Sequence, residues 1–377
     1  MFVENRLRHL LATGTVSAKV LAPQPWFFNA RARFAESRHG IEVLHPSFLT
    51  IPKLGLWLNP EFLYRAAKQQ LETVLASGEK FDLIDAHYFY PDGVAAVRLG
   101  KKFNLPVVIT ARGSDITQFP DFPYPRRQIL AAAAACDAII TVSGGLKRAM
   151  TDLGVAPDKI TVLRNGVDLS QFTPQDRAEA RTKLNVEGKI LLSVGALIAR
   201  KGHDRTITAL RDLPGFTLLI AGAGEERSRL EALAAQLGIA NRVKFLGAVA
   251  HQDLAPLYSA ADISVLASSR EGWANVLLES LACGTPVVAS PIPGNDEVIG
   301  APVAGRLAAE NTAPALAAAI MALDAAIPAR EAVRAYAENF SWDAVSAGQL
   351  ALFSAVLARR AKTRHHEPFN PHGVAAG

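Results

Sequence analysis

Short apolar runs alternate with amphipathic stretches along most of the chain. In the first half, the runs have the length and the β-branched content of buried strands, and they cover residues 19–23, 41–46, 81–87, 106–110, 137–142 and 159–163. Between the third and fourth runs, Ala95, Leu99 and Phe103 recur at the spacing of one helix face. A strand, a helix and another strand in this order predict a βαβ unit with parallel strands.

A second alternating series follows a polar connection. Residues 168–188 are rich in charged side chains and contain a proline, which is typical of a segment between domains. Apolar runs then resume, at residues 189–195, 216–222, 242–247, 261–268 and 285–290. The pattern therefore predicts two similar α/β halves that enclose a cleft.

The composition agrees with two ordinary domains and restricts the class of partner. The chain has 377 residues, of which 50% are hydrophobic, and this is more than one core usually serves. The Ala-rich run 129–136 ends at Asp137, well short of the roughly 20 residues that a membrane-spanning helix needs. A net charge of +5 favours anionic partners such as nucleotide diphosphates or lipid phosphates, while dispersed arginines argue against nucleic acid.

The start of the sequence and its cysteines point to the cytoplasm. Met1 is followed by charged residues and not by a basic segment leading into an apolar one, so we expect no secretory signal. Cys136 and Cys283 lie in apolar surroundings without metal-ligand spacing, and we expect reduced core thiols.

Two glutamates in residues 261–290 suggest a ligand site. An apolar strand runs into a polar loop with Glu271, and a helix that carries Glu279 begins near Ala274 and ends at Gly284. In open α/β sheets, ligands bind beyond the carboxyl ends of the strands, where a helix N-terminus offers free N–H groups to a phosphate. Carboxylates repel phosphate but accept hydrogen bonds from sugar hydroxyls. The combination predicts a nucleotide-sugar pocket.

This stretch also resembles a known family. The glutamates within "EGWANVLLESLACGTPVV" are similar to the donor signature of the family 4 retaining glycosyltransferases. Further similar stretches follow the family order, and they are "AHYFYPDGVAA", "TARGSDI", "VLRNGVDLSQF", "SVGALIARKGHD", "LIAGAGEE" and "FLGAVAHQDLAPLYSAADISVLAS". The resemblance implies the GT-B fold, in which two Rossmann-like domains face each other across a cleft. It also implies an acceptor-binding domain at 1–172 and a donor-binding domain at 173–340. A helix is expected at 341–361, and the Pro, Gly and His content without periodicity of the residues that follow indicates a disordered tail at 362–377.

The family assigns roles to individual residues. Glu271 would hold the hydroxyls of the transferred sugar, and Glu279 would hold the ribose. Lys201 would neutralise the β-phosphate as it leaves, with Arg200 beside it. The residues implied in donor binding are Gly195, Lys201, Gly272, Asn275, Val276 and Glu279. If Glu271 is an exposed cleft carboxylate, it adds little to stability.

Two positions depart from the family pattern. Ala196 follows Gly195, at a position where many relatives carry a second cation. Lys201 must then neutralise more of the negative charge on the leaving group, or Arg200 neutralises part of it. Arg112 replaces a histidine that many relatives place near the transferred sugar. Because arginine stays protonated, it cannot shuttle a proton, but it suits an anionic sugar or acceptor.

Simpler structural roles compete with these assignments. Glu271 can be a solvated loop charge and Glu279 a helix-surface residue, while Lys201 can merely open a helix. The acceptor-side candidates are His87, Arg112 and Asp115; His87 is equally well a core histidine, and for Asp115 we favour a helix cap. Asn165, Gly166 and Asp168 are expected to shape a turn at the cleft.

The sequence thus predicts a cytoplasmic enzyme that transfers a sugar from a nucleoside diphosphate donor to a hydroxyl acceptor with retention, in cell-surface polysaccharide or glycolipid synthesis. No DxD pair lies in a suitable loop, so we expect no metal, and no cofactor besides the nucleotide-sugar co-substrate. Two alternatives stay open. One is a GT-B nucleotide-sugar epimerase, and the other is a non-catalytic protein that binds sugar nucleotides.

Aromatic residues stand beside arginines in residues 23–38 and 47–65. This combination suits a lipid-linked acceptor and peripheral contact with anionic membrane at the inner face of the cell membrane. An ordinary loop packed on its own core explains the pattern equally well.

The beginning of the sequence matches the family from its first helix onward, whereas GT-B domains start with a strand and a glycine-bearing loop. We therefore expect that the first domain lacks its first strand and that Met1 is not the true start. In-frame codons upstream should then encode a β-rich run and a glycine-containing loop.

Overall fold

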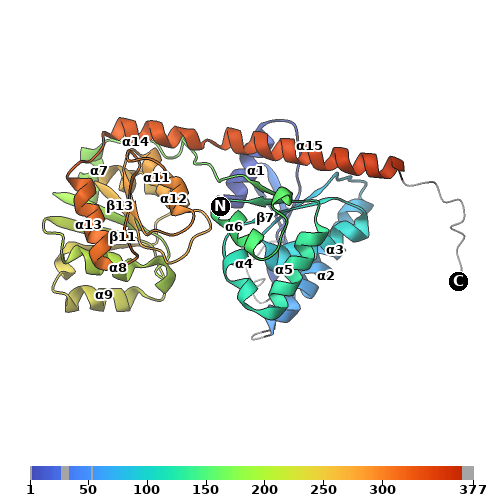
Figure 1. Ribbon diagram of the computed structural model, residues 1–377, viewed down its shortest axis with the longest axis horizontal. Helices are drawn as coiled ribbons and strands as arrows, with labels where there is room; N and C mark the ends of the chain where they lie inside the picture. The colour runs from blue at the N-terminus through green and yellow to red at the C-terminus, as the bar shows by residue number, and fades with distance from the viewer. Residues whose placement is uncertain (1, 27–33, 52–53, 367–377) are drawn as a thin grey trace, which may run out of the picture.

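The computed structural model describes residues 2–26, 34–51 and 54–366. Two α/β domains lie side by side, and the last helices run across both of them (Figure 1). Residues 27–33, inside one of the aromatic-rich stretches, and residues 367–377, in the predicted tail, lie outside the described residues.

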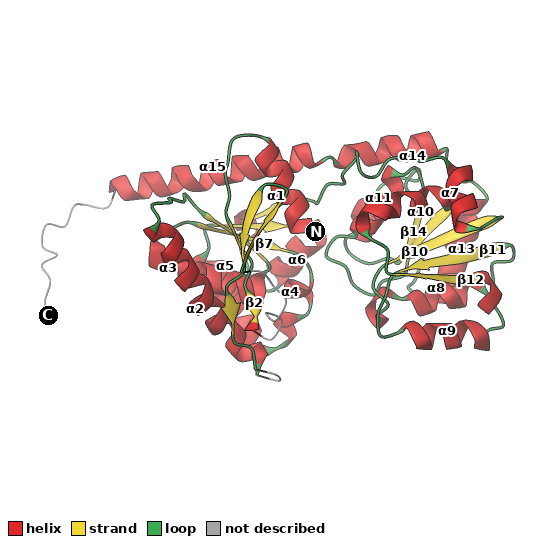
Figure 2. Cartoon of the chain, turned by 180° about the vertical axis from the view of Figure 1, so that it is seen from behind, coloured by secondary structure: helices red, strands yellow, loops and turns green. Residues whose placement is uncertain are grey.

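The first domain is built on a parallel sheet in the order β6-β7-β8-β9. Its strands are β6 (Ile84–His87), β7 (Val107–Ala111), β8 (Ala138–Thr141) and β9 (Ile160–Val162). The central strands β7 and β8 are buried along their whole length because helices cover both faces of a parallel sheet, and Val108, Ile109 and Ile139 are fully buried. The edge strand β6 carries Asp85 and His87. The covering helices include α2 (Gly55–Ala76), α3 (Val94–Phe103), α5 (Pro123–Ala135) and α6 (Gly144–Asp152), with the short α4 (Ser114–Thr117) beyond β7 (Figure 2).

Residues 20–48 form two further small sheets. One has the order β1-β4-β3, and the other pairs β2 with β5; the bounds are β1 (Val20–Leu21), β2 (Gln24–Pro25), β3 (Ala35–Arg38), β4 (Ile41–Leu44) and β5 (Ser47–Phe48). β1 and β4 lie where the sequence predicts strands. β3 is a polar, mostly exposed strand that pairs antiparallel with β4 across His39 and Gly40, both of which have positive φ. The expected upstream strand concerns residues outside this sequence and stays a prediction.

The second domain contains a six-stranded parallel sheet in the order β12-β11-β10-β13-β14-β15. Its strands are β10 (Lys189–Val194), β11 (Phe216–Ala221), β12 (Val243–Gly247), β13 (Ile263–Leu266), β14 (Val287–Ala289) and β15 (Gly305–Leu307). Its helices are α7 (Arg177–Leu184), α8 (His203–Leu210), α9 (Arg227–Gln236), α10 (Leu254–Ala260), α11 (Asn275–Ala282), α12 (Asn295–Val298) and α13 (Ala313–Asp324). The strand order reverses between β10 and β13, and such a switch point is where open α/β sheets bind ligands.

The carboxyl-terminal helices join the two domains. α14 (Arg330–Ala337) packs on the second domain, and α15 (Trp342–His366) crosses to α1 (Phe2–Ala12) of the first (Figure 1). His9 stacks on Trp342 with the ring centroids 5.6 Å apart, and buried Arg6 donates from Nε to Gln349 Oε1 at 2.7 Å. α15 continues to His366, so the predicted helix end at 361 is too early, because the charged residues that follow still favour a helix.

Residues 330–362 are long and apolar enough to cross a membrane by length and composition alone. In the structure this stretch is divided into α14, a 3₁₀ turn and α15, and it buries Val333, Trp342 and Val356 against the two domains. Packing within the protein therefore accounts for these three apolar side chains, while 33% of the apolar window as a whole is buried.

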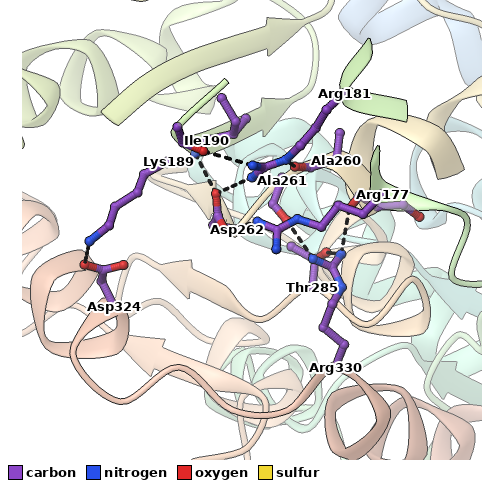
Figure 3. A network of polar contacts seen from close by, with 12 residues as sticks. Arg177, Arg181, Lys189, Ile190, Ala260, Ala261, Asp262, Thr285, Asp324 and Arg330 are labelled. Carbon is purple, nitrogen blue, oxygen red and sulfur yellow. Dashed lines mark hydrogen bonds and ion pairs between the residues drawn. The ribbon is translucent and has the colours of Figure 1, made fainter. Parts of the chain in front are cut away.

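A network of polar contacts joins the amino ends of the central strands of the second domain (Figure 3). The Asp262 carboxylate accepts a hydrogen bond from the Ile190 amide at 2.7 Å and pairs with Arg181, at 2.7 Å, and with Arg177. Arg330 donates to the carbonyl groups of Ser259 and Ala261 and to Thr285 Oγ1. These contacts lie at the end of the sheet opposite to the switch-point loops.

Replacing Asp262 with Ala should lower the free energy of unfolding by about 2–3 kcal/mol, because two guanidinium groups and an amide lose their acceptor. Urea denaturation measures the loss. The matched control is Asp212→Ala, since that half-exposed carboxylate pairs with the adjacent Arg211. Equal stability of the two variants would contradict the role given to the Asp262 network.

Candidate active site

Glu271 lies on the loop that follows β13, and it is paired rather than solvated. Its Oε1 accepts hydrogen bonds from Lys201 Nζ and from Ser268 Oγ, both at 2.7 Å. Arg200 Nη1 lies 3.5 Å from Oε2, and only 9% of the Glu271 side chain is exposed. The structure therefore brings together the residues expected to be catalytic, but the expectation of an exposed carboxylate that adds little to stability is wrong.

A close approach between two loops creates this pair. Gly202 opens α8 with φ +69, and a Cβ atom there would lie 2.1 Å from the Ala267 carbonyl oxygen. Only glycine therefore lets the loop after β10 approach the end of β13 so closely. The preceding residue, Lys201, thereby reaches Glu271, and its stem passes over Gly195, whose φ is +155. Lys201 thus precedes a helix start and also contacts Glu271.

Glu279 is buried in α11, with 4% of the residue exposed. His251 Nε2 lies 2.8 Å from Oε1, and the Tyr258 hydroxyl donates to Oε2 at 3.0 Å. Burial and the nearby Glu279 charge raise the pKa of Tyr258 well above its ordinary value, so the phenol keeps its proton. A small cavity at this point is lined by Glu279, His251 and Asn275 and, from the first domain and α15, by Asn5 and Trp342.

The sequence analysis missed His251 and Tyr258. A signal was available, because His251 follows β12 and so lies at the same carboxyl edge of the sheet as the loops after β10 and β13. Tyr258 belongs to α10, where its apolar neighbours favoured an ordinary core residue.

The N-terminus of α11 meets the first domain. Its N-cap position, Ala274, has no side-chain cap, and Asn275 and Val276 are partly exposed. A Cβ atom on Gly272 would lie 1.9 Å from the Arg112 carbonyl oxygen, so the glycine permits this interdomain contact. The Asn275 amide donates to the Trp273 carbonyl oxygen at 3.1 Å, and the positive end of the helix dipole lies at this contact between the domains.

His87 and Arg112 contact each other at the carboxyl edge of the first sheet. Burial first, and then the charges of Arg112 and Arg6, lower the pKa of His87 well below its usual value, so the imidazole is neutral at pH 7. Its Nδ1 then accepts from Arg112 Nη2 at 2.9 Å. Burial also lowers the pKa of Arg112 to about 9, which leaves the guanidinium charged at neutral pH.

Asn165 extends this series of hydrogen bonds into the second domain. Arg112 Nη1 donates to Asn165 Oδ1 at 3.3 Å, and Asn165 Nδ2 donates to Asn275 Oδ1 at 3.3 Å. The "RNGVD" segment also forms the expected turn, since the Asp168 carboxylate accepts from the amides of Ser170 and Gln171.

Asp115 does not act as the expected helix cap. Gly113 holds the N-cap position of α4, and Asp115 is fully buried inside the helix. Its carboxylate accepts hydrogen bonds from the amides of Phe89, Arg112 and Gly113, at 2.7–3.2 Å. The residue therefore fastens the loop after β6 to the loop after β7, because one buried carboxylate satisfies three amides.

Glu297 of the second domain caps a helix of the first. It accepts from the amides of Gly144 and Gly145, at 3.1 and 2.9 Å, and pairs with Arg164 at 2.7 Å. These contacts lower its pKa despite partial burial. A negative charge at the N-terminus of α6 is favourable, so the contact holds the two domains together at one side of the cleft.

Each of the two domains matches a known protein family over nearly its whole length. "Glycosyltransferase Family 4" matches residues 7–171, and "Glycosyl transferases group 1" matches residues 174–340. A D-inositol 3-phosphate glycosyltransferase from Acidothermus cellulolyticus is 33% identical over 309 residues, which are 74% of this chain and 68% of that protein. A protein of the same name from Geodermatophilus obscurus is 31% identical over 361 residues, 86% of this chain and 78% of the relative.

Solved structures share the architecture. Sucrose-phosphate synthase of Thermosynechococcus elongatus superposes with a TM-score of 0.81 at 24% identity, covering 94% of this chain and 92% of that one. HepE of Anabaena, solved with UDP and glucose, gives a TM-score of 0.71 at 23% identity over 84% and 87% of the two chains.

The two Rossmann-like domains have the GT-B fold, and the family matches and relatives define the protein as a glycosyltransferase. The chain belongs to the family 4 glycosyltransferases, the group that includes the glycosyl transferases group 1 domain. It transfers a sugar from a nucleotide sugar. The resemblance, the fold class and the enzyme class predicted from the sequence are confirmed.

Glu271→Ala should abolish sugar transfer and also lower the free energy of unfolding by about 1–3 kcal/mol, because Lys201 and Ser268 lose a buried acceptor. Release of nucleoside diphosphate and urea denaturation measure the two effects. The control is Glu187→Ala, which removes an exposed carboxylate of the same domain. Wild-type turnover in the Glu271 variant would remove this residue from the active site.

Proposed function

We propose that the protein is a retaining glycosyltransferase that moves a hexosyl group from a nucleoside diphosphate sugar to a hydroxyl acceptor. The observation that supports this most is the Lys201–Glu271 pair, which lies at the sheet switch point together with the uncapped N-terminus of α11. A cation and a helix N-terminus suit the leaving diphosphate, and a carboxylate suits the hydroxyls of the sugar.

Each group then has one task. The N-terminus of α11 at Asn275 and Val276, with Gly272 beside it, receives the diphosphate, and the Asn275 amide exchanges the Trp273 carbonyl oxygen for a phosphate oxygen. Lys201 moves its ammonium from Glu271 toward the β-phosphate, with Arg200 as its neighbour, and Glu271 accepts hydrogen bonds from the sugar. Glu279 accepts from the ribose hydroxyls in the small cavity. No metal or further cofactor is part of this proposal.

The proposed chemical step takes place on one face of the sugar. The bond between the anomeric carbon and the β-phosphate oxygen breaks, and that oxygen takes the proton of the acceptor hydroxyl. The acceptor oxygen bonds to the anomeric carbon from the same face, which retains the configuration. Once it has turned toward the β-phosphate, the Lys201 ammonium stabilises the negative charge that develops on the diphosphate.

The acceptor is proposed to carry a negative charge. Arg112 is cationic, sits at the carboxyl edge of the first sheet and contacts neutral His87. The relatives named D-inositol 3-phosphate glycosyltransferase also support an acceptor with a phosphate group. A phosphorylated polyol or a phospholipid-linked sugar, in polysaccharide or glycolipid synthesis, fits both observations.

A thermal-shift screen of nucleoside diphosphates and their sugars tests the donor side, because a ligand of the folded state raises the melting temperature. NMR of the product formed with the identified donor then reports the anomeric configuration. An inverted product would refute retention, and a donor isomer formed without acceptor would instead show an epimerase.

Lys201→Ala should lower kcat by roughly 100-fold while the donor KM changes only a few-fold, because its charge matters most as the leaving group develops. Steady-state kinetics with the donor from the screen separate the two constants. Lys183→Ala, on the exposed face of α7, is the matched control. An unchanged kcat would assign the leaving-group charge to Arg200 or to the dipole of α11.

We also propose that the first domain contacts an anionic membrane. Five exposed apolar side chains, here called the apolar rim, surround the β2–β5 pair and the start of α2; they are Trp26, Phe34, Leu49, Leu54 and Trp57, each 45–63% exposed. Exposed aromatic and aliphatic groups on a basic protein suit the interface of an anionic bilayer.

The double variant Leu54→Ser/Trp57→Ser should bind vesicles of phosphatidylglycerol and phosphatidylcholine several-fold more weakly than the wild type, since it removes apolar surface from the rim. Co-sedimentation at low salt measures the bound fraction. Ile327→Ser removes an equally exposed side chain from the second domain and serves as the control. Absence of wild-type binding would end the membrane proposal.

A further inference from the structure

The Glu279 carboxylate is held from two sides, and the two partners differ in what holds them. Tyr258 is fully buried in α10, a fixed helix of the second domain. His251 lies on the loop after β12, and its other ring nitrogen, Nδ1, contacts Gln171 Nε2 at 3.0 Å. Gln171 is the last residue of the first family match and begins the connection between the domains.

The contacts of Gln171 and Glu279 with His251 determine which ring nitrogen of His251 carries the proton. The Gln171 side-chain amide also lies 3.2 Å from the His251 carbonyl oxygen, which can only accept, so the atom that faces it is the NH₂ group. That NH₂ group also donates to Nδ1, which must therefore carry a lone pair. The remaining proton of the neutral imidazole is on Nε2, and it is donated to Glu279 Oε1 at 2.8 Å.

The connection itself is anchored at this point. The Asp168 carboxylate accepts from the Gln171 amide at 3.0 Å, and Arg334 donates to the carbonyl oxygens of Leu169 and Phe172. Phe172, buried beside Gln171, meets the His251 ring edge-on with centroids 5.0 Å apart. The histidine thus has a fixed ring plane, a fixed tautomer and a partner on the segment that joins the domains.

We infer that Gln171 and His251 are positioning residues that aim the Glu279 carboxylate at the donor ribose and tie its position to the interdomain connection. The inference rests on the proposed contact of Glu279 with the ribose. Without His251, Oε1 keeps its charge but loses its donor, and the carboxylate turns away from the cavity. Without Gln171, the ring loses the contact that selects its tautomer.

The test compares binding of uridine, adenosine and guanosine diphosphate with binding of their 2′,3′-dideoxy forms by calorimetry, and it continues with the base that binds most tightly. The wild type should prefer the ribose form by at least roughly tenfold, as expected for loss of hydrogen bonds to a charged group. An equal affinity for both forms would overturn the ribose contact itself, and the inference with it.

Given that preference, His251→Phe keeps a ring against Phe172 and should bind the ribose form about tenfold more weakly, with the dideoxy form within twofold of the wild type. His251→Gln should restore most of the preference, because its amide can donate to Glu279. In turnover the same variants should raise the donor KM and leave kcat within about threefold. A structural defect would instead weaken both forms equally, and that result would overturn the inference.

Gln171→Met tests whether the connection acts through the histidine. It should reduce the ribose preference about threefold in the wild type and have no further effect in the His251→Phe background. Additive losses would show that Gln171 acts independently and would overturn the coupling. Gln236→Met, at the exposed end of α9, is the matched control and should leave both affinities unchanged.

Discussion

The parallel pairing of β10 with β13 is the contact on which the site depends. Leu191 pairs with Ile263 and Leu192 with Ser264, and the sheet order reverses across this pair. Because the connections that leave the two strands run in opposite directions, their loops are not covered by a crossover and can meet each other. Gly202 then closes the distance to the Ala267 carbonyl, and the cation of one loop reaches the carboxylate of the other.

Three buried carboxylates are paired with partners of different chemical kinds. Glu271 is matched by side chains, namely the Lys201 ammonium, the Ser268 hydroxyl and the Arg200 guanidinium. Glu279 contacts an imidazole and a phenol hydroxyl, and its carboxylate also lines the small cavity. Asp115 is matched by backbone amides alone and is accordingly part of the scaffold. The chemical type of the partner therefore distinguishes a residue that works on a ligand from one that shapes the loop.

The sequence predicts the strands of the two main sheets except β15, because most of them are largely apolar runs, and this pattern needs no knowledge of the neighbouring strands. β15 has the sequence Gly-Arg-Leu and carries no such signal. β2, β3 and β5 escape prediction as well. β3 is polar and is defined by its antiparallel partner β4, while β2 and β5 span two residues each. A strand of this kind exists through pairing and not through its own composition.

In the site, too, features set by a contiguous motif are predicted, and features set by contacts between distant segments are not. The resemblance places Glu271, Lys201 and Glu279, since these residues belong to contiguous motifs. It gives no account of the Glu271 environment, which arises between segments 70 positions apart. It also misses His251 and Tyr258, whose relevance depends on the side chain that they meet in space. The local sequence predicts that Asp115 caps a helix, whereas its carboxylate also accepts a hydrogen bond from the Phe89 amide on another loop.

The crossing of α15 back to the first domain has a consequence for the order in which the protein is assembled. Arg6 and Gln349 stand 343 positions apart, and helix α1 obtains a large part of its packing from α15. During synthesis α1 emerges before α15 and cannot be buried in its final place until the second domain and α15 have also been made. The second domain, whose sheet is contiguous in sequence, can reach its native form earlier. Completion of the first domain thus waits for a helix that is made after the whole of the second domain.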